Sequence, residues 1–465
     1  MKHIHLIGIG GAGMSAIATV LLESGYTVSG SDAQESDMTG KLAARGATVA
    51  IGHRPENVIG ADMVVSSSAI ATDNPEVLAA RAAGLPVLKR ADFLGELMQG
   101  RTGVAVAGTH GKTTTTALIA YILTRAGCDP SFIVGGVLAD LGTNARHGNG
   151  AVFVIEADEY DHMFLGLHPK VAVLTNVEHD HPDFFPTAES YRQAFEKFVS
   201  LLPADGVLIA CGDQAGAREI GRQAEQNGVR VVWYGLKNGS EWKAESVQAN
   251  GAGGSDFLVM RGGDTLGLAR NRLPGLHNVA NSLAALAAAE AVGVDFNAAR
   301  NALSEFQGVG RRFEVKGEVR GVTVVDDYAH HPTEIRATLA AARRRYAGRQ
   351  VWAMFQPHTF SRTRAMLADF AASFAEADHV LVTDIFASRE SYDSSVSARD
   401  IVAQMSHPDA RYVASLAEVA GTLVAEMRPG DVLITLGAGN GNTVGEAVLK
   451  AMANNGELRM ASAES

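Results

Sequence analysis

Short runs rich in β-branched residues alternate with helix-forming segments along the whole chain of 465 residues. This alternation is typical of βαβ units, in which parallel strands are joined by crossover helices. At about 150 residues per domain, the length predicts roughly three domains. We therefore expect an α/β protein built from about three domains with largely parallel sheets.

The alternating pattern changes character near residue 100 and near residue 310. The predicted domains cover residues 1–99, 100–309 and 310–465. The first is expected to open with a strand over residues 3–9 and a helix over residues 15–24. In the second, residues 237–267 loosen into glycine, serine and short alternating runs, which indicates a small antiparallel excursion.

Composition excludes several classes of protein. The formal net charge is −11 and no basic run is present, so nucleic acid is not an expected partner. The two cysteines, Cys128 and Cys211, have neither disulfide-framework nor zinc-site spacing. No stretch reaches the roughly 18 apolar residues of a membrane span, and no secretory signal follows Met1. We expect a cytoplasmic protein that does not bind membranes.

A glycine-rich turn, Gly8-Ile9-Gly10-Gly11-Ala12-Gly13, follows the first predicted strand and precedes a helix. It satisfies G-x-G-x-x-G, and Asp32 stands at the end of the next strand. Backbone amides at such a helix N-terminus can approach a diphosphate. The motif therefore indicates a diphosphate nucleotide, and by itself leaves open a nicotinamide cofactor or a turn without a ligand.

A second loop, Gly108-Thr109-His110-Gly111-Lys112-Thr113-Thr114, lies between an apolar strand and a helix. Its amides can cradle phosphates, the ammonium can neutralise the terminal phosphates, and a threonine hydroxyl can ligate Mg²⁺. The spacing departs from G-x-x-x-x-G-K-[ST], because Val106 stands where the first glycine is expected. We interpret the segment as a compact phosphate-binding loop for ATP.

Two further polar clusters follow central strands of the predicted second domain. Glu156-Ala157-Asp158-Glu159 follows one strand, and Asn176-Val177-Glu178-His179-Asp180-His181 follows another. In open α/β sheets, ligands gather beyond the carboxyl ends of strands, where the phosphate loop also lies. A carboxylate and an imidazole from these clusters are therefore candidate magnesium ligands.

The third predicted domain repeats this arrangement of polar residues after strands. It contains Gly310-Arg311-Arg312-Phe313-Glu314, a segment from Asp326 through Glu334 that reads DDYAHHPTE, and residues 356–364, QPHTFSRTR. Adjacent arginines can bridge phosphates by bidentate hydrogen bonds, and an aspartate at a strand end can accept from ribose hydroxyls. Each segment alone would more often be a polar surface turn, but their repetition favours a ligand site.

Together and in this order, these motifs resemble those of the Mur ligase family, the ATP-dependent amide-bond-forming enzymes of peptidoglycan synthesis. The resemblance covers nearly the whole chain and rests on IHLIGIGGAGMSAIA, GTHGKTTT, EADE, DDYAHHPTE and FQPHTFSRTR. Within the family, these segments look like those of the members that join L-alanine to UDP-N-acetylmuramate through an acyl phosphate. The resemblance implies a Rossmann-like first domain for the UDP-sugar, a central P-loop ATPase-like domain with a mostly parallel sheet, and a Rossmann-like third domain that closes over both.

The resemblance also implies roles for individual residues. The residues expected to hold the UDP-sugar are Gly10, Gly11, Ala12, Gly13, Asp32, Ser67 and Ser68. Those expected to bind ATP are Gly108, Thr109, His110, Gly111, Lys112, Thr113, Thr114, Asn278, Asn281, Arg311, Arg312 and Asp327. Magnesium would be held by Thr113, Glu156 and His181, and the amino acid by Tyr328, His358 and Arg362. Lys112, His330 and Arg362 are the expected catalytic residues, with His330 as a candidate base of ordinary pKa.

Two positions depart from the family's pattern. Several members place a carbamylated lysine where rough alignment puts Phe195, so a second metal would depend on Glu156 and His181. Some alanine-adding members carry arginine where Thr359 stands, which leaves the alanine carboxylate more dependent on Arg362.

Three other functions remain open at this point. One is a ligase of the same family that attaches a recycled peptide to UDP-N-acetylmuramate, although its opening glycine loop usually differs from GIGGAGM. Another is an NAD(P)-dependent oxidoreductase, which would leave Lys112, Glu156 and His181 without a role. The third is a nucleotide-binding regulator without turnover. The sequence leaves monomer and homodimer equally open.

Overall fold

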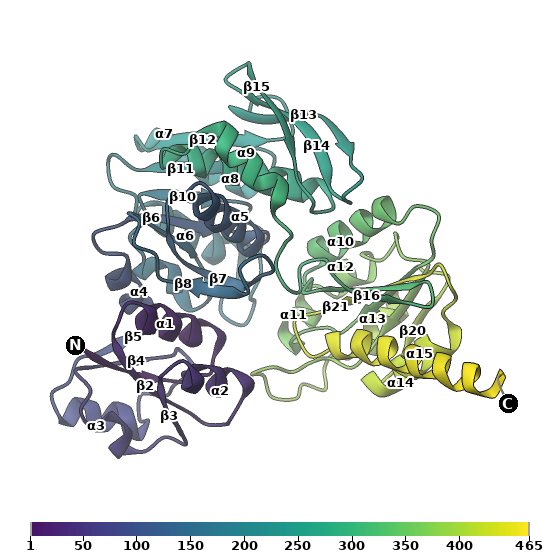
Figure 1. The fold of residues 1–465 in the computed structure, drawn as a ribbon, viewed down its shortest axis with the longest axis horizontal. Helices are drawn as coiled ribbons and strands as arrows, with labels where there is room; N and C mark the ends of the chain where they lie inside the picture. The colour runs from purple at the N-terminus through teal and green to yellow at the C-terminus, as the bar shows by residue number, and fades with distance from the viewer. Residues whose placement is uncertain (1, 464–465) are drawn as a thin grey trace.

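The computed structural model describes residues 2–463 and contains three α/β domains that follow one another along the chain (Figure 1). Each domain has its own sheet, and the predicted fold class is confirmed. The strand order is β3-β2-β1-β4-β5 in the first sheet, β15-β14-β13-β12-β11-β10-β6-β9-β7-β8 in the second and β16-β17-β21-β18-β19-β20 in the third.

The first domain has a fully parallel sheet. Its elements are β1 (His3–Ile7), α1 (Ala12–Glu23), β2 (Thr27–Asp32), α2 (Asp37–Ala44), β3 (Thr48–Ile51), η1 (Pro55–Val58), β4 (Met63–Ser66), α3 (Pro75–Ala82), β5 (Val87–Lys89) and α4 (Arg90–Met98). The expected first strand is two residues too long, because Gly8 has φ +81° and turns the chain out of the sheet. The helix begins at Ala12, earlier than expected, directly behind this turn.

The second domain is the largest, and parallel strands form the middle of its sheet. Its elements are β6 (Thr102–Ala107), α5 (Lys112–Arg125), β7 (Ser131–Leu138), β8 (Thr143–Arg146), β9 (Val152–Glu156), η2 (Tyr160–Gly166), β10 (Val171–Leu174), α6 (Ala188–Val199), β11 (Val207–Cys211), α7 (Ala215–Gln226), β12 (Arg230–Gly235), β13 (Trp242–Ala249), β14 (Ser255–Arg261), β15 (Asp264–Arg270), α8 (Leu276–Ala291) and α9 (Phe296–Glu305). Strands β13 to β15 pair antiparallel, which confirms the predicted excursion.

In the third domain, one antiparallel edge strand joins an otherwise parallel sheet. Its elements are β16 (Glu314–Val319), β17 (Val322–Asp327), α10 (Pro332–Arg345), β18 (Val351–Phe355), α11 (Phe360–Ala365), α12 (Leu367–Ala371), β19 (His379–Val382), α13 (Ala398–Gln404), β20 (Ala410–Tyr412), α14 (Leu416–Glu426), β21 (Val432–Leu436) and α15 (Asn442–Ala463).

The first two domains share one apolar core, whereas the third has its own. Helix α1 packs against β7 and β8, and Ile17 and Leu21 belong to the same buried cluster as Leu118 and Phe132 of the second domain. The third domain buries separate clusters, one that contains Val325 and Phe355 and another that contains Val324 and Met354. Since neighbouring residues on a strand face opposite sides of a sheet, these clusters cover its two faces.

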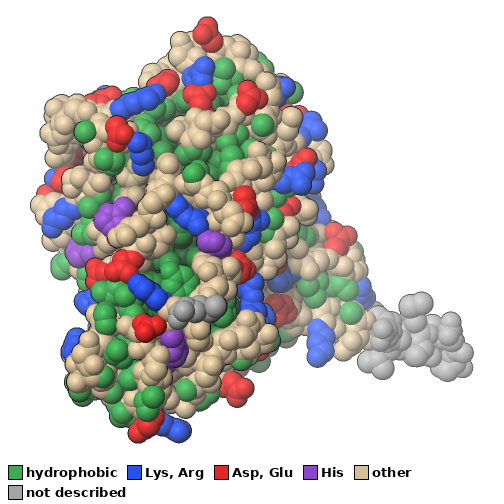
Figure 2. All heavy atoms as spheres, turned by 60° about the vertical axis from the view of Figure 1, so that its left-hand side comes forward, with side chains coloured by type: hydrophobic (Ala, Val, Ile, Leu, Met, Phe, Trp, Pro, Cys, Tyr) green, Lys and Arg blue, Asp and Glu red, His purple; other side chains and the backbone are tan. Residues whose placement is uncertain are grey.

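Two further properties concern the helices and the surface. Across the described residues, no helix combines the length and apolarity needed to cross a membrane. On the face drawn in Figure 2, acidic and basic side chains are interspersed, with no extended basic area.

The first domain contains a buried carboxylate with a complete set of polar partners. Glu76, in the first turn of α3, is fully buried and accepts hydrogen bonds from Ser31 Oγ at 2.5 Å and from Asn57 Nδ2. His53 Nδ1 lies 3.0 Å and His5 Nε2 3.7 Å from its carboxylate oxygens. Burial alone would raise the pKa of Glu76, but these four partners lower it to about 2.

Replacing Glu76 by Gln is expected to lower the free energy of unfolding by about 2–3 kcal/mol at pH 7, because the buried His5 and the partly buried His53 lose their anionic partner. The ionised carboxylate stabilises fully above pH 4.5, and its contribution is lost as the pH falls toward 2. The difference in free energy of unfolding between the wild type and the variant should therefore become smaller as the pH is lowered. Urea unfolding between pH 3.5 and 7 measures it, with Glu56→Gln on the exposed surface as the matched control.

Candidate active site

The central sheet brings the predicted phosphate loop and both acidic clusters to one edge. Strand β6 lies between β9 and β10, and both pairings are parallel. The carboxyl ends of these three strands therefore meet, followed respectively by residues 108–111, 156–159 and 175–181. This juxtaposition is what the order of motifs along the chain predicted.

The backbone of the phosphate loop depends on two glycines. Gly108 has φ +139°, and a Cβ there would overlap Thr175 Oγ1. Gly111 has φ +79° and is the residue before α5. Both conformations disfavour any residue with a Cβ. The loop therefore reaches the helix N-terminus in the compact form expected for an anion site.

Lys112 is held at the centre of this edge. Its Nζ donates to the carbonyl oxygens of Gly108 at 2.5 Å and Thr109 at 3.1 Å, and it lies 2.9 Å from Glu159 Oε2. Glu159 is buried and accepts a further hydrogen bond from Tyr191 Oη at 2.9 Å. Sequence reasoning did not assign Glu159 a role, although the EADE cluster that contains it was noted.

The expected magnesium ligands have an oxygen-rich setting. Thr113 Oγ1 donates to Glu156 Oε1 at 2.9 Å, and burial raises the pKa of Glu156 although Lys112 opposes this. His181 Nε2 lies 3.9 Å from Glu159 Oε1, and its Nδ1 is buried without a hydrogen-bond partner. A hydroxyl and a carboxylate suit Mg²⁺, and the unpartnered imidazole nitrogen is free to bind it. The residues present therefore fit a divalent cation.

The two positions that depart from the family's pattern, Phe195 and Thr359, are both buried. Phe195 in α6 is fully buried, and its ring packs against Phe164 and Tyr191. Thr359 is also buried, has φ +69°, and its amide donates to the Phe386 carbonyl at 2.9 Å. Neither position presents a charged group to the site.

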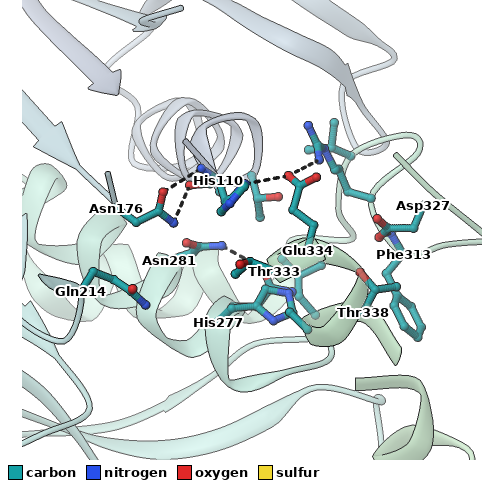
Figure 3. Close-up of a pocket in the computed structure, with 17 residues that line it drawn as sticks. His110, Asn176, Gln214, His277, Asn281, Phe313, Asp327, Thr333, Glu334 and Thr338 are labelled. Carbon is teal, nitrogen blue, oxygen red and sulfur yellow. Dashed lines mark hydrogen bonds and ion pairs between the residues drawn. The ribbon is translucent and has the colours of Figure 1, made fainter. Parts of the chain in front are cut away.

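A cavity of about 240 Å³ opens beside the phosphate loop, between the second and third domains (Figure 3). Predicted ATP-binding residues from both domains line it, namely His110, Gly111, Thr114, Asn278, Asn281, Arg312 and Asp327. Burial raises the pKa of Asp327 to about 6, although Arg312 acts in the opposite direction. Asn176 and His277 also line the cavity and were not predicted individually.

Arg311 does not line this cavity. Its Nε donates to Asp326 at 3.0 Å and its Nη2 to the Gly437 carbonyl at 2.8 Å, so it braces the edge of the third sheet. Arg312 does face the second domain, and its Nη2 donates to Thr113 Oγ1 at 3.3 Å. The two adjacent arginines therefore have different surroundings, which their sequence does not reveal.

His110 joins the two domains across the cavity. Its Nε2 lies 3.3 Å from Glu178, and its Nδ1 lies 3.2 Å from Glu334 at the start of α10, toward which it points in Figure 3. Thr333 of the same helix donates to Glu178 at 2.8 Å. Burial alone would lower the pKa of His110, but Glu334 and Glu178 raise it to about 9. Neither glutamate was predicted as a site residue.

His110, Glu178 and His331 also come close enough to hold a cation, with ligand atoms within 4.8 Å of one another. Their hydrogen bonds argue against that use. His331 Nδ1 accepts from the Thr333 amide at 3.2 Å, so the proton of a neutral ring sits on Nε2. His110 is protonated on both ring nitrogens at pH 7, so it also has no free lone pair for a metal. The cluster is better described as an interdomain polar contact.

The predicted amino-acid site lies where α11 approaches the second domain. Arg362 Nε donates to Asp180 at 2.8 Å, and Arg362 Nη1 lies 3.2 Å from His358 Nδ1. The rings of His330 and His358 are 5.9 Å apart. Tyr328 lies instead under Arg311 and Arg312, with guanidinium carbons 4.9 and 5.1 Å from its ring centre.

The two histidines of this group do not have ordinary pKa values. Burial lowers the pKa of His330 to about 3, with Arg362 acting in the same direction and Glu334 against it. Burial, together with Arg362 and Arg389, lowers the pKa of His358 to about 4. Both rings are therefore neutral at pH 7. The expectation of an unperturbed imidazole at His330 was wrong, because sequence does not report burial.

In the first domain, the expected UDP-sugar residues gather at the carboxyl edge of the sheet. The Gly10 amide donates to Asp32 Oδ2 at 2.9 Å, and Gly11 precedes α1. A Cβ on Gly8 would lie 3.1 Å from the Ser67 Cβ, so the serine turn after β4 packs against the glycine loop, with Ser68 next to it. Arg90, which was not predicted, covers Gly13 so closely that a Cβ there would overlap its guanidinium.

Comparison with known proteins agrees with this arrangement. Three family models match, described as "Mur ligase family, catalytic domain" over residues 3–102, "Mur ligase middle domain" over residues 106–289 and "Mur ligase, glutamate ligase domain" over residues 311–439.

Two relatives described as UDP-N-acetylmuramate--L-alanine ligases, from Roseiflexus castenholzii and Caldanaerobacter subterraneus, are 47% and 45% identical. Each alignment covers 97% of this chain and 97% of the relative.

Solved structures show the same similarity. A UDP-N-acetylmuramate-alanine ligase from Thermotoga maritima aligns with a TM-score of 0.81 at 29% identity, over 98% of this chain and all of that one. A murein peptide ligase from Psychrobacter arcticus aligns with a TM-score of 0.70, also at 29% identity, over 98% of this chain and 99% of that one. The resemblance inferred from the motifs is confirmed, and the chain belongs to the Mur ligase family.

Proposed function

We propose that this protein is a cytoplasmic, ATP-dependent ligase that joins L-alanine to the lactyl carboxylate of UDP-N-acetylmuramate in peptidoglycan synthesis. One observation carries the proposal: the edge of the second domain that holds the phosphate loop contacts the third domain directly, through Arg312 at Thr113 Oγ1 and through Arg362, which lies beside His358, at Asp180. The near full-length similarity to relatives described as alanine ligases supports the choice of substrates.

A carboxylate is a poor electrophile, so the lactyl group is first phosphorylated by ATP to an acyl phosphate. This step needs positioning and charge neutralisation more than covalent participation by the protein. Lys112, now turned to Glu159, is placed to meet the terminal phosphates. Thr113, Glu156 and His181 are the residues that would hold Mg²⁺, which supplies positive charge for the transferring phosphoryl group.

The second step is attack of the alanine amine on the acyl carbon, which expels phosphate. The amine must be deprotonated when it attacks. His330 is neutral at pH 7 and so has a free lone pair, but a pKa of about 3 makes it a weak base. Its contribution is therefore to accept a hydrogen bond and orient the amine rather than to retain a proton.

Closure of the third domain protects the acyl phosphate from water. Its contacts with the second domain are polar, as at His110–Glu334, Thr333–Glu178 and Arg362–Asp180. Polar contacts exchange readily with water, whereas the shared apolar core ties the first domain to the second. ATP entering beside His110 is expected to rearrange these contacts.

Substrate use tests the proposed function directly. ADP release measured with ATP, Mg²⁺ and UDP-N-acetylmuramate should require L-alanine, with glycine and L-serine as weaker substrates. Release that occurs only with a tripeptide would instead identify a peptide-adding ligase of the same family, the activity described for the similar murein peptide ligase. Nucleotide binding without any release of ADP would identify a regulator. Hydride transfer to or from NAD(P) would identify an oxidoreductase.

Replacing Lys112 by Ala should lower kcat for ADP release by at least about 100-fold, because the terminal phosphates lose their compensating charge. Thermal unfolding of the variant should show that it remains folded. Lys170→Ala is the matched control, since Lys170 is half-exposed and pairs with Asp205 on the surface, away from the phosphate loop. Full activity of Lys112→Ala would refute the assignment of the phosphate loop.

The docked position of the third domain should depend on pH. Since the pKa of His110 is raised to about 9, protonation favours the docked arrangement fully below pH 6.5, and this contribution is lost as the pH rises through about 9. Side-chain NMR should find His110 protonated at pH 8, and Glu334→Gln should lower its pKa. Glu305→Gln, at the far end of α9, is the control. A wild-type His110 titrating near pH 6.5 would contradict the contact.

A further inference from the structure

One buried ion pair connects the second and third domains, and its acidic member, Asp180, has no role in the chemistry described so far. Asp180 lies in the loop after β10, and Arg362 lies in α11. Arg362 Nε donates to Asp180 Oδ1 at 2.8 Å, and the two side chains are 3% and 4% exposed. Burying two charges costs desolvation energy that a single ion pair repays only in part, so a stability role alone does not account for it.

Each charge is fixed by its own domain. Asp180 Oδ1 also accepts from the backbone amide of His181 at 2.7 Å. Arg362 Nη1 lies 3.2 Å from His358 Nδ1 and 3.3 Å from the His358 carbonyl oxygen. When the domains separate, a carboxylate and a guanidinium therefore remain in place on opposite walls of the cleft. An opposed pair of this kind is complementary to an α-amino acid zwitterion, which carries both charges on one carbon.

The surroundings also show which member of the pair lies nearer the phosphate loop. Asp180 Oδ2 lies 3.8 Å from His181 Nε2, which lies 3.9 Å from Glu159, the partner of Lys112. The Asp180 end therefore faces the phosphate loop, where the acyl phosphate would form. The Arg362 end faces the third domain. An amino acid bound with its nitrogen at Asp180 would have that nitrogen toward the acyl group it must attack.

We propose that Asp180 binds the ammonium group of the incoming amino acid, which enters between Asp180 and Arg362 and replaces their direct ion pair. Arg362 then binds the carboxylate, as expected from the resemblance. This inference rests on the proposed ligase function. Asp180 and Arg362 recognise only the ammonium and carboxylate groups, which all α-amino acids share. Selection of L-alanine over glycine or L-serine therefore depends on other contacts.

The first test is Asp180→Asn. Its KM for L-alanine should rise about 10- to 100-fold, the range for losing a hydrogen bond between charged groups. With hydroxylamine in place of L-alanine, this variant should form the hydroxamate of UDP-N-acetylmuramate within about threefold of the wild-type rate. Hydroxylamine is uncharged at pH 8 and attacks the acyl phosphate directly, forming the N–C bond and releasing phosphate, so it does not need Asp180.

The matched control is Asp183→Asn. Asp183 belongs to the same loop, pairs with Arg389 of the third domain at 2.7 Å and accepts from Tyr160 Oη at 3.0 Å. It loses the same charge and also an interdomain ion pair. Its KM for L-alanine should change less than threefold, which separates recognition of the ammonium group from a general loss of domain contact.

Competition by L-lactate sharpens the test, because lactate has the carboxylate and methyl of L-alanine but no ammonium group. In the wild type, bound lactate leaves Asp180 without a cationic partner and should inhibit weakly. In Asp180→Asn, lactate should inhibit several-fold more strongly while L-alanine binds less well. A purely structural role for Asp180 would weaken both ligands together.

The outcomes separate the two proposals. No ADP release by the wild type with L-alanine refutes the proposed function. Wild-type turnover combined with an unchanged alanine KM in Asp180→Asn refutes the role of Asp180 alone. If that variant does not fold, Asp180→Glu keeps the charge but moves it, and should raise the alanine KM with hydroxamate formation retained. Loss of hydroxamate formation in both variants would also overturn the role.

Discussion

The parallel pairing of β9, β6 and β10 is the constraint on which the rest of the active site depends. Parallel strands in register end at the same edge, so the loops that follow them must meet there. That edge receives the phosphate loop, Glu156 and the segment with Asp180 and His181. The antiparallel excursion of β13 to β15 lies at the far side of the same sheet and leaves this edge open. The parallel register therefore places the candidate phosphate-binding and metal-binding residues at one edge of the sheet, whatever contacts their side chains make.

The contrast between the two domain interfaces explains how such a site can open and close. The first domain is joined to the second by a shared apolar core, which is stable only while water is excluded. The third domain is joined by ion pairs and hydrogen bonds at His110, Asp180 and Thr333. Water and ligands can replace those partners at modest cost. The movable surface is thus also the surface that contacts substrates, and each interdomain contact is a candidate for exchange with a ligand group.

Much of this arrangement could be predicted because it depends on local patterns. The glycines at positions 8, 108 and 111 have positive φ, and strand-glycine-helix patterns indicate such turns. The clusters after β9 and β10 were placed at one edge by the rule for parallel sheets, and the excursion at residues 237–267 was visible in its composition. Strand ends were less certain, as at β1, where one glycine shortened the strand.

Other features could not be predicted, because they arise from contacts between residues far apart in sequence. Glu334 meets His110 only through the docking of α10, and Asp180 meets Arg362 across 182 positions. Glu178 meets His110 because the loop after β10 lies beside the phosphate loop, 68 positions earlier in the chain. The low pKa of His330 comes from burial between domains. Arg311 and Arg312 are neighbours in sequence, but Arg311 bonds to Asp326 within the third domain, whereas Arg312 lines the ligand cavity and donates to Thr113.

The sequence by itself therefore determined the fold class, the phosphate-binding turns and the family, because these depend on periodicity and on the backbone freedom of particular residues. Only the tertiary structure decided which charges are paired, which imidazoles are neutral and which arginine faces the cavity. Those properties depend on desolvation and on distances between separate domains, and neither is encoded in the order of neighbouring residues.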